Sequence, residues 1–368
     1  MSSSHAPRTM YPAGNCFYVA GAHVESRHGA RIAGQMYVQH FPAPARAFPF
    51  PVVMVHGLGQ SGNCYLGTPD GRPGWAAHFV ASGFDVYVVD QVGHARSGTA
   101  LEPAGYAEMD VARVQHLLGG DPYPQAGLHT QWPGIAKAPG DPAFDQMMAG
   151  QMAFLADPER HEALNFAAQA ALLHRIGPAV YLTHSQSGPT GWKLADEYPE
   201  LVKAVVAVEP NGPPYFDLVF TGGDPWYRYA DRPARAYGLT RLPLRFDPPL
   251  AENETLPYVA GPAARDANLA HGFLQPAPAR RLPRLACVPV AVVTAQASYR
   301  TPYDHCTVDF LRQAGVQAEH LRLEEHGISG NGHMMMLERN NAEIATLLAA
   351  WIQRNVPASG APRGAGRP

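Results

Sequence analysis

Short apolar runs alternate with longer amphipathic stretches along most of this chain. Continuous apolar and β-branched runs are typical of strands buried on both faces, and the stretches between them have helical periodicity. The expected strands cover residues 16–24, 31–41, 51–55, 84–90, 179–184, 202–208, 288–294 and 318–323, and the expected helices cover 74–83, 158–175, 190–198, 303–314 and 334–354. The alternation predicts an α/β fold with an eight-strand, mostly parallel sheet, in which the first two strands form an antiparallel hairpin at the edge.

Two long segments interrupt this alternation. Residues 99–157 have mixed character, and residues 213–283 are rich in Pro, Gly and aromatic side chains without clear periodicity. Long irregular segments of compact domains are often functional, so we expect a rim and a cap over a ligand site. The alternative for the second segment is a packed surface excursion with no role in binding. We therefore predict one domain over residues 1–356 and a disordered tail over 357–368.

Composition and charge exclude several classes of function. The formal net charge is −3, and no Lys/Arg-rich run occurs outside the C-terminal tail, which argues against nucleic-acid binding. No stretch approaches the roughly 20 apolar residues of a membrane span. The first residues lack the basic and apolar regions of a signal peptide, so we expect a cytoplasmic protein, or a periplasmic one if the chain is a processed form. The sequence leaves homodimerisation open.

The four cysteines have no metal-binding or redox spacing. Cys16, Cys64, Cys287 and Cys306 are scattered, and no two form a C-x-x-C pair. In a chain of this length such residues are more often buried thiols than a disulfide framework. We therefore expect neither a zinc site nor a redox motif.

A serine follows the buried run of residues 179–184 directly. Ser185 stands between this expected strand and an expected helix, which is the setting of a nucleophile elbow. Thr183 and Ser187 occupy the two places where the G-x-S-x-G consensus has glycine. Ser187 is a rival nucleophile, although Pro189 would remove a backbone donor just past the turn. The other alternative is that Ser185 only caps a helix.

A glycine-rich turn follows the expected strand 51–55. Residues 56–62 lack the Gly-Lys-Ser/Thr of a P-loop and the spacing of a dinucleotide fingerprint. In serine hydrolases the loop at this place supplies one backbone N–H to the oxyanion hole, and the residue after the nucleophile supplies the other. The expected donors are therefore the backbone amides of Leu58 and Gln186.

A serine hydroxyl needs a base and a third group that orients the base. His333 follows the last expected strand, where the chain order nucleophile, acid, histidine places the base. His326 is a nearby competitor, whereas the side chain of His184 should point to the other face of the strand end.

Two carboxylates compete for the role of the acid. Glu209 directly follows the expected strand 202–208. Asp304 follows the expected strand 288–294, at the start of a helix, where it also suits the positive end of the helix dipole.

Several of these sequence features occur together in one known group of proteins. The chain resembles the α/β-hydrolase fold superfamily over about residues 50–355, through His56-Gly57, Asp90-x-x-Gly93-His94-x-Arg96-Ser97, His184-Ser185-x-Ser187-Gly188 and Gly332-His333. It is also similar to a small group of bacterial carboxylesterases. These share the Thr-Pro-Asp-Gly-Arg-x-Gly-Trp stretch (residues 68–75), the His-Ser-Gln-Ser-Gly elbow and the Gly-Asn-x-His-Met-Met-Met run (residues 330–336).

The resemblance implies a serine, histidine and acid triad that cleaves carboxylic esters. Most members of the superfamily place an Asp after the seventh strand, where this chain has Gln296-Ala297-Ser298. The carboxylesterase group uses a Glu after the sixth strand, which favours Glu209. The expected activity is hydrolysis of a small-molecule ester through an acyl-enzyme, without a metal or organic cofactor.

The same residues are compatible with other functions. The triad could serve lactone hydrolysis, acyl transfer or C–C bond hydrolysis, and the sequence does not rank these. A protein of another class, with a hydrolase fold that binds a small molecule without catalysis, has no need to keep Ser185, His333 and Glu209 together.

Overall fold

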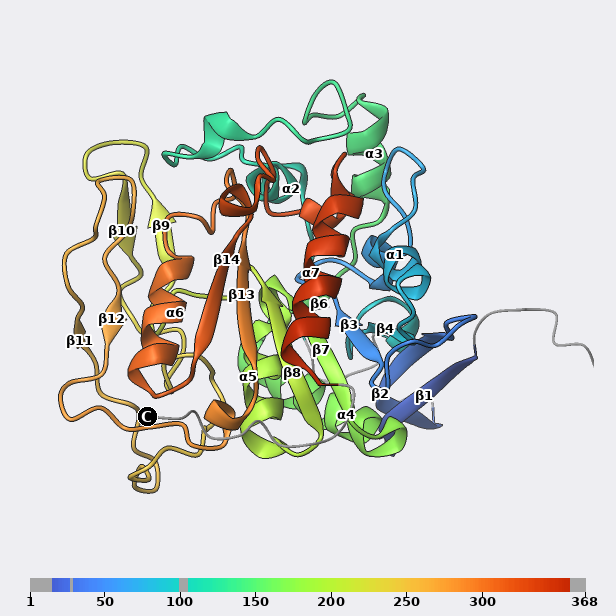
Figure 1. Ribbon diagram of the computed structural model, residues 1–368, viewed down its shortest axis with the longest axis horizontal. Coiled ribbons are helices and arrows are strands. Elements are labelled where there is room, and N and C mark those ends of the chain that lie inside the picture. The colour runs from blue at the N-terminus through green and yellow to red at the C-terminus, as the bar shows by residue number, and fades with distance from the viewer. Residues whose placement is uncertain (1–14, 27–28, 99–104, 358–368) are drawn as a thin grey trace, which may run out of the picture.

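The computed structural model describes residues 15–26, 29–98 and 105–357 (Figure 1). The central sheet consists of β1 (Cys16–Ser26), β2 (Gly29–Phe41), β3 (Val52–Val55), β4 (Val86–Asp90), β7 (Ala179–His184), β8 (Val202–Val208), β13 (Val290–Thr294) and β14 (Ala318–Arg322). The α-helices are α1 (Trp75–Ala81), α2 (Val111–Leu117), α3 (Pro142–Ala149), α4 (Pro158–Ile176), α5 (Gly188–Glu197), α6 (Asp304–Gln313) and α7 (Asn341–Asn355).

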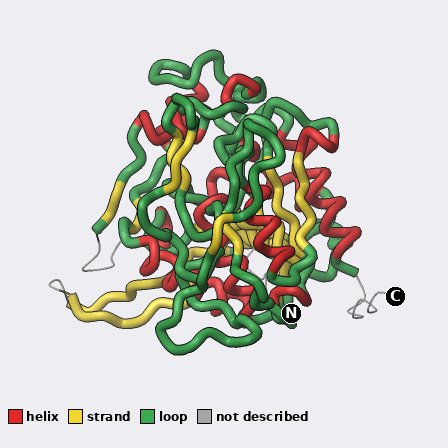
Figure 2. The backbone as a smooth tube through the Cα atoms, turned by 90° about the vertical axis from the view of Figure 1, so that its left-hand side faces the viewer, coloured by secondary structure: helices red, strands yellow, loops and turns green. Residues whose placement is uncertain are grey.

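The eight strands form one sheet in the order β1-β2-β4-β3-β7-β8-β13-β14. The pairs from β4 to β14 are parallel, whereas β1 pairs with β2 and β2 with β4 in antiparallel fashion. The hairpin of β1 and β2 extends beyond the body of the molecule, at the lower left of Figure 2. The predicted fold class, an eight-strand mostly parallel α/β sheet, is confirmed.

Alternate residues of the central strands pack into two separate hydrophobic cores. In β7, Val180 and Leu182 join one core, and Ala179 and Tyr181 join the other. The first core also receives Trp351 of α7, and the second receives residues of α4 and α5. Every residue of β7 is buried, as expected for a strand covered on both faces.

The start of α4 agrees with the local sequence signals. Asp157 caps the helix by accepting hydrogen bonds from the amides of Glu159 and Arg160, and Pro158 occupies the first turn. The expected and observed bounds of this helix therefore agree closely.

The start of the last helix differs from the prediction. It was expected from residue 334, but α7 begins at Asn341, after a 3₁₀ turn over Met335–Leu337. Glu338 lies between the two and directs its side chain back to the amide of Gly332. The backbone of Glu338 is extended, with a ψ of 168°, so the 3₁₀ turn and α7 do not form one continuous helix.

The two long segments contain little regular structure. The first holds α2, α3 and the strand pair β5 (Tyr106–Ala107) and β6 (Phe154–Leu155). The second holds the pairs β9 (Leu218–Phe220) with β10 (Tyr227–Tyr229), and β11 (Val259–Ala260) with β12 (Phe273–Leu274). In Figure 1, α2 and α3 lie in the upper part of the molecule, on the side of the sheet edge where β13 and β14 end.

Hydrogen bonds join the first long segment to the carboxyl edge of the sheet. The amide of Thr130 donates a hydrogen bond to the carbonyl of Gly330. The hydroxyl of Tyr123 donates one to the carbonyl of Ala297. The division into one domain over residues 1–356 with two insertions stays a prediction. The predicted tail lies outside the described residues except for Pro357.

The expectation that the cysteines are buried thiols holds for two of the four. Cys64 and Cys306 are buried, whereas Cys16 and Cys287 are exposed. All four thiols are free.

Candidate active site

Ser185 lies on a sharp turn between β7 and α5. Its φ is 53°, in the left-handed region that non-glycine residues rarely adopt, and a 3₁₀ turn over Ser185–Ser187 leads into the helix. Neighbouring segments approach the turn closely at Gly57 and Gly188, where a side chain would collide with them. A Cβ on Gly57 would lie 3.0 Å from the Cβ of Ser185, and a Cβ on Gly188 would lie 2.6 Å from that of Pro210. The strand, the strained turn and the helix have the geometry of a nucleophile elbow.

The hydroxyl of Ser187 stabilises the turn from inside. Ser187 is fully buried, and its single O–H donor is shared between the carbonyl oxygens of Val55 and His184, which lie 2.9 and 3.0 Å from Oγ. The same Oγ accepts a hydrogen bond from the amide of His184 at 2.9 Å. These contacts join the elbow to β3 and give a structural reason for serine where the consensus has glycine.

Glu209 follows β8 directly and is fully buried. Its φ is 45°, so both Ser185 and Glu209 have a left-handed backbone just past a strand end. Its Oε1 accepts a hydrogen bond from the amide of Ala295 at 2.9 Å, and its Oε2 accepts one from the hydroxyl of Ser298 at 2.6 Å. Burial raises the pKa of Glu209 well above its usual value, and these two hydrogen bonds oppose the shift.

His333 reaches the same place from the loop before α7. Its Nδ1 is 2.5 Å from Oε2 of Glu209, and the two side chains are almost completely buried. Burial lowers the pKa of His333 well below its usual value. Because the two groups share a hydrogen bond, their protons titrate as a pair.

Two of the competing residues do not take part in the hydrogen bond between Glu209 and His333. Asp304 accepts a hydrogen bond from the hydroxyl of Thr294 at 2.9 Å, and burial raises its pKa to about 7. His326 is exposed at the end of a 3₁₀ turn after β14. The expectation that His184 points away from the site is wrong: it lines the same pocket, and its Nε2 is 3.1 Å from the carbonyl of His333.

A pocket of about 240 Å³ contains Ser185 and His333. Leu58 and Gln186, the expected oxyanion-hole residues, also line it. Leu58 comes from the loop after β3, and Gln186 directly follows the serine. The pocket therefore brings together the predicted nucleophile, the predicted base and both residues expected to provide oxyanion donors.

Two further residues approach the reacting atoms and were not predicted from the sequence. The Oη of Tyr299 is 3.3 Å from Nε2 of His333, and Nη2 of Arg300 is 3.4 Å from Oγ of Ser185. Within the described site, no direct hydrogen bond joins Oγ of Ser185 to His333. Such bonds often form only when substrate is bound. No sequence signal marks Tyr299 and Arg300, because their approach depends on the path of the loop after β13.

A second buried pair of a histidine and a glutamate supports the loop that carries His333. Glu338 accepts hydrogen bonds from the amide of Gly332 at 3.0 Å and from Nδ2 of Asn331 at 2.7 Å. Its Oε1 is also 2.6 Å from Nε2 of His129, which belongs to the first long segment. This segment thereby helps to position the residues next to His333.

The stretch of residues 68–75 supports the same region from the other side. Arg72 donates a hydrogen bond to the carbonyl of Glu338 at 3.1 Å. The indole of Trp75 donates to the carbonyl of Asn341 at 2.9 Å. The stretch therefore fixes the start of α7.

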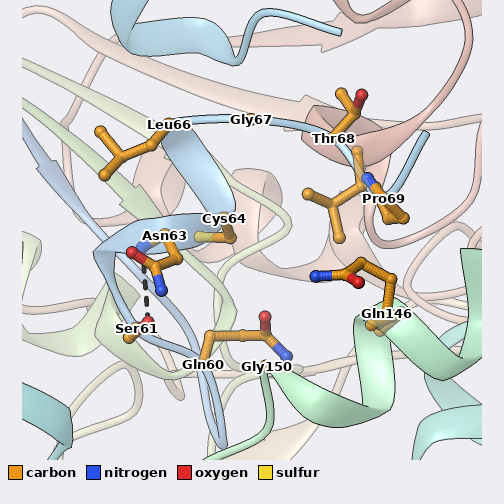
Figure 3. Close-up of a pocket in the computed structure, with 12 residues that line it drawn as sticks. Gln60, Ser61, Asn63, Cys64, Leu66, Gly67, Thr68, Pro69, Gln146 and Gly150 are labelled. Atoms are coloured by element: carbon orange, nitrogen blue, oxygen red, sulfur yellow. Dashed lines mark hydrogen bonds between the residues drawn. The ribbon is translucent and has the colours of Figure 1, made fainter. Parts of the chain in front are cut away.

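A larger hollow of about 440 Å³ adjoins the pocket of Ser185 (Figure 3). The two share Gln60, whose Nε2 donates to Oε1 of Gln151 at 2.9 Å. Polar groups of Ser61, Asn63 and Gln146 line the hollow together with Cys64 and other residues shown in Figure 3.

Comparison with known proteins places this chain in one family of folds. The family model for the alpha/beta hydrolase fold matches residues 51–236. The chain is 42% identical over 324 residues to "Probable secreted lipase phiG" from Fungal sp. (strain ATCC 74256), covering 87% of this chain and 86% of that protein. The chain belongs to the alpha/beta hydrolase fold family, which confirms the resemblance seen in the sequence at the level of the superfamily.

One solved structure has the same fold over nearly the whole chain. "The Atomic Resolution Structure of a Novel Bacterial Esterase" superposes with a TM-score of 0.64 at 22% identity, over 97% of this chain and 100% of that one. Among the helices in the described residues, none has the length and apolar character needed to span a membrane.

Proposed function

We propose that this protein is a serine hydrolase that cleaves small-molecule carboxylic esters, with Ser185 as nucleophile, His333 as base and Glu209 as the acid. The observation that carries the proposal is the placement of Ser185 and His333 in one pocket, with Nδ1 of His333 2.5 Å from Glu209. Membership of the alpha/beta hydrolase fold family and the similarity to a lipase support an ester hydrolase.

The reaction follows from these positions. His333 accepts the proton of Ser185 through Nε2, while Glu209 orients the ring through Nδ1 and stabilises the imidazolium that forms. The alkoxide attacks the ester carbonyl, and the backbone amides of Leu58 and Gln186 bind the oxyanion. The alcohol leaves with the proton from His333. Water, deprotonated by the same histidine, then releases the acid from the acyl-enzyme.

The pocket favours a short acyl group. Its volume of about 240 Å³ is small, since pockets for drug-sized ligands typically have about 300–1,000 Å³. Leu58, Leu117 and Phe154 give it an apolar wall that suits a hydrocarbon chain. We expect activity to fall as the acyl chain outgrows this volume.

A panel of 4-nitrophenyl esters of increasing acyl length tests the proposal. The wild-type protein should hydrolyse short esters best, and Ser185→Ala should lose at least about 10³-fold in kcat. Ser82→Ala is the matched control, because Ser82 is exposed at the end of α1. Absence of hydrolysis in the wild type, or equal rates in wild type and Ser185→Ala, would contradict the proposal.

The cellular location stays a prediction. The name of the fungal relative describes a secreted protein. Export is therefore an alternative to the cytoplasmic location expected from the sequence, and fractionation of expressing cells distinguishes the two.

A further inference from the structure

A positively charged side chain borders the pocket beside Ser185. Arg300 lies in the loop after β13, and its Nη2 is 3.4 Å from Oγ of Ser185. It lines the same pocket as Ser185 and His333, and only 5% of its surface is exposed. A guanidinium group is thus held within a few ångströms of the atom that would attack the substrate.

Neutral groups hold this guanidinium in place. Nη2 donates to Oδ1 of Asn211 at 2.9 Å, and Nη1 donates to the carbonyl of Gly212 at 3.2 Å. The ring centroids of Tyr299 and Tyr303 lie 5.0 and 5.6 Å from its Cζ. These contacts fix the position of the charge without neutralising it.

No carboxylate of a described residue forms an ion pair with Arg300. The two buried carboxyl groups nearby have other partners, since Glu209 contacts His333 and Asp304 contacts Thr294. Each acts on Arg300 only through space. A buried charge is costly unless it is paired, so the site is suited to an anionic group supplied from outside.

The position of Arg300 separates it from the loop that carries Leu58. Leu58 follows β3, on one side of the β7 strand that ends at Ser185. Arg300 follows β13, which lies on the other side of β7, beyond β8. The oxyanion and the group that contacts Arg300 would therefore lie on opposite sides of Ser185 along the sheet edge.

We propose that this pocket selects esters that carry a carboxylate close to the scissile carbonyl, such as hemiesters of short dicarboxylic acids, and that Arg300 binds this carboxylate. The inference rests on the proposed ester hydrolase function and names its substrate class. A guanidinium makes strong charge-assisted hydrogen bonds to carboxylates, and a water-poor pocket strengthens them. The short distance to Ser185 requires a short diacid, in agreement with the small pocket.

The test compares monoethyl succinate with ethyl butyrate, a neutral ester of matched chain length. Base titration of the released acid at about pH 7.5, where the hemiester is ionised, gives kcat/KM for each ester. The wild type should favour monoethyl succinate. Arg300→Met should lower the ratio of the two kcat/KM values about ten- to a hundredfold, the loss expected for a charge-assisted hydrogen bond.

Two further variants make the comparison specific. Arg300→Lys keeps the positive charge and should restore part of the ratio. Arg354→Met removes an arginine whose side chain is 60% exposed at the end of α7, and it should leave the ratio unchanged. If Arg300→Met does not fold, the preference of the wild type decides by itself.

The outcomes separate this inference from the proposed function. A wild type that hydrolyses ethyl butyrate but discriminates against monoethyl succinate overturns the role of Arg300 alone. An unchanged ratio in folded Arg300→Met also overturns it, because the preference for the charged ester would then not depend on Arg300. A wild type that hydrolyses neither ester, and does not react with a fluorophosphonate, contradicts both proposals.

Discussion

Nδ1 of His333 lies 2.5 Å from Oε2 of Glu209, although 124 positions separate the two residues in the sequence. Glu209 directly follows β8, and His333 lies in the loop between β14 and α7. The parallel sheet brings their loops to the same edge, where ligands of such folds bind. Ser298 and Ala295, both after β13, hold the carboxylate in place.

The identity of the acid can be tested by neutral replacements of the two buried carboxyl groups. Glu209→Gln should lower kcat about 10³- to 10⁴-fold, since an amide neither orients His333 correctly nor stabilises its charged form. Asp304→Asn should have a much smaller effect, because Asp304 contacts Thr294 and not His333. Steady-state kinetics on a 4-nitrophenyl ester measures both. A larger loss in Asp304→Asn would assign the acid to the loop after β13.

The pH profile should report the burial of the base. His333 must be neutral to accept a proton, and burial lowers its pKa below the ordinary 6.5. Activity should therefore persist as the pH falls through 6.5 and disappear only at lower pH, where the pair of His333 and Glu209 takes up its first proton. Measurement of kcat/KM between about pH 4 and pH 9 locates the acid limb. An acid limb at or above the ordinary value would contradict the expected shift.

Ser187 should contribute to stability and not to chemistry. Ser187→Ala removes the donor to the Val55 and His184 carbonyls and leaves the buried amide of His184 without its hydroxyl acceptor. We expect a loss of about 1–3 kcal/mol in the free energy of unfolding. Denaturant unfolding measures this loss.

The same variant distinguishes the two serines of the elbow. Folded Ser187→Ala should still react with a fluorophosphonate. A stable but unreactive Ser187→Ala would favour Ser187 as the nucleophile.

Glu338 should position the loop of His333. The two carboxylate oxygens of Glu338 contact Gly332, Asn331 and His129. In Glu338→Gln, an NH₂ group, which only donates, takes the place of one of these oxygens. An unpaired buried donor costs about 1–3 kcal/mol of stability. We also expect kcat to fall more than KM rises, because a displaced base reduces the stabilisation of the transition state and leaves substrate binding unchanged.

Glu343→Gln is the matched control for Glu338→Gln. Glu343 lies in the first turn of α7 and is exposed. It should leave kcat unchanged. Equal kinetic effects of the two variants would contradict a positioning role for Glu338.

The apolar runs predicted the central sheet well because its strands are buried on both faces. The run that forms β7 and the one that forms β8 were each expected with the bounds that the structure has. The elbow and the turn at Glu209 follow from the ends of these strands. The helix α3 was missed, although Asp141 and Pro142 are a cap and a first-turn signal, because the residues around it lack a long amphipathic period.

Other parts of the site depend on contacts between distant segments and had no sequence signal. The start of α7 was expected too early because the run of residues 334–337 looks helical, whereas Glu338 turns back to the preceding loop. The prediction that the side chain of His184 points away from the site is wrong because strand alternation does not continue through the strained turn at Ser185. Arg300 enters the site only through the folded path of its loop.

The most direct test of the central claim is to identify the residue that a fluorophosphonate modifies. Intact-mass measurement followed by peptide mapping should find one adduct on Ser185 in the wild type and none in Ser185→Ala. Glu209→Gln should be labelled more slowly than the wild type, because its base is poorly oriented. Labelling at another residue, or an unchanged adduct in Ser185→Ala, would contradict the assignment of Ser185 as the nucleophile.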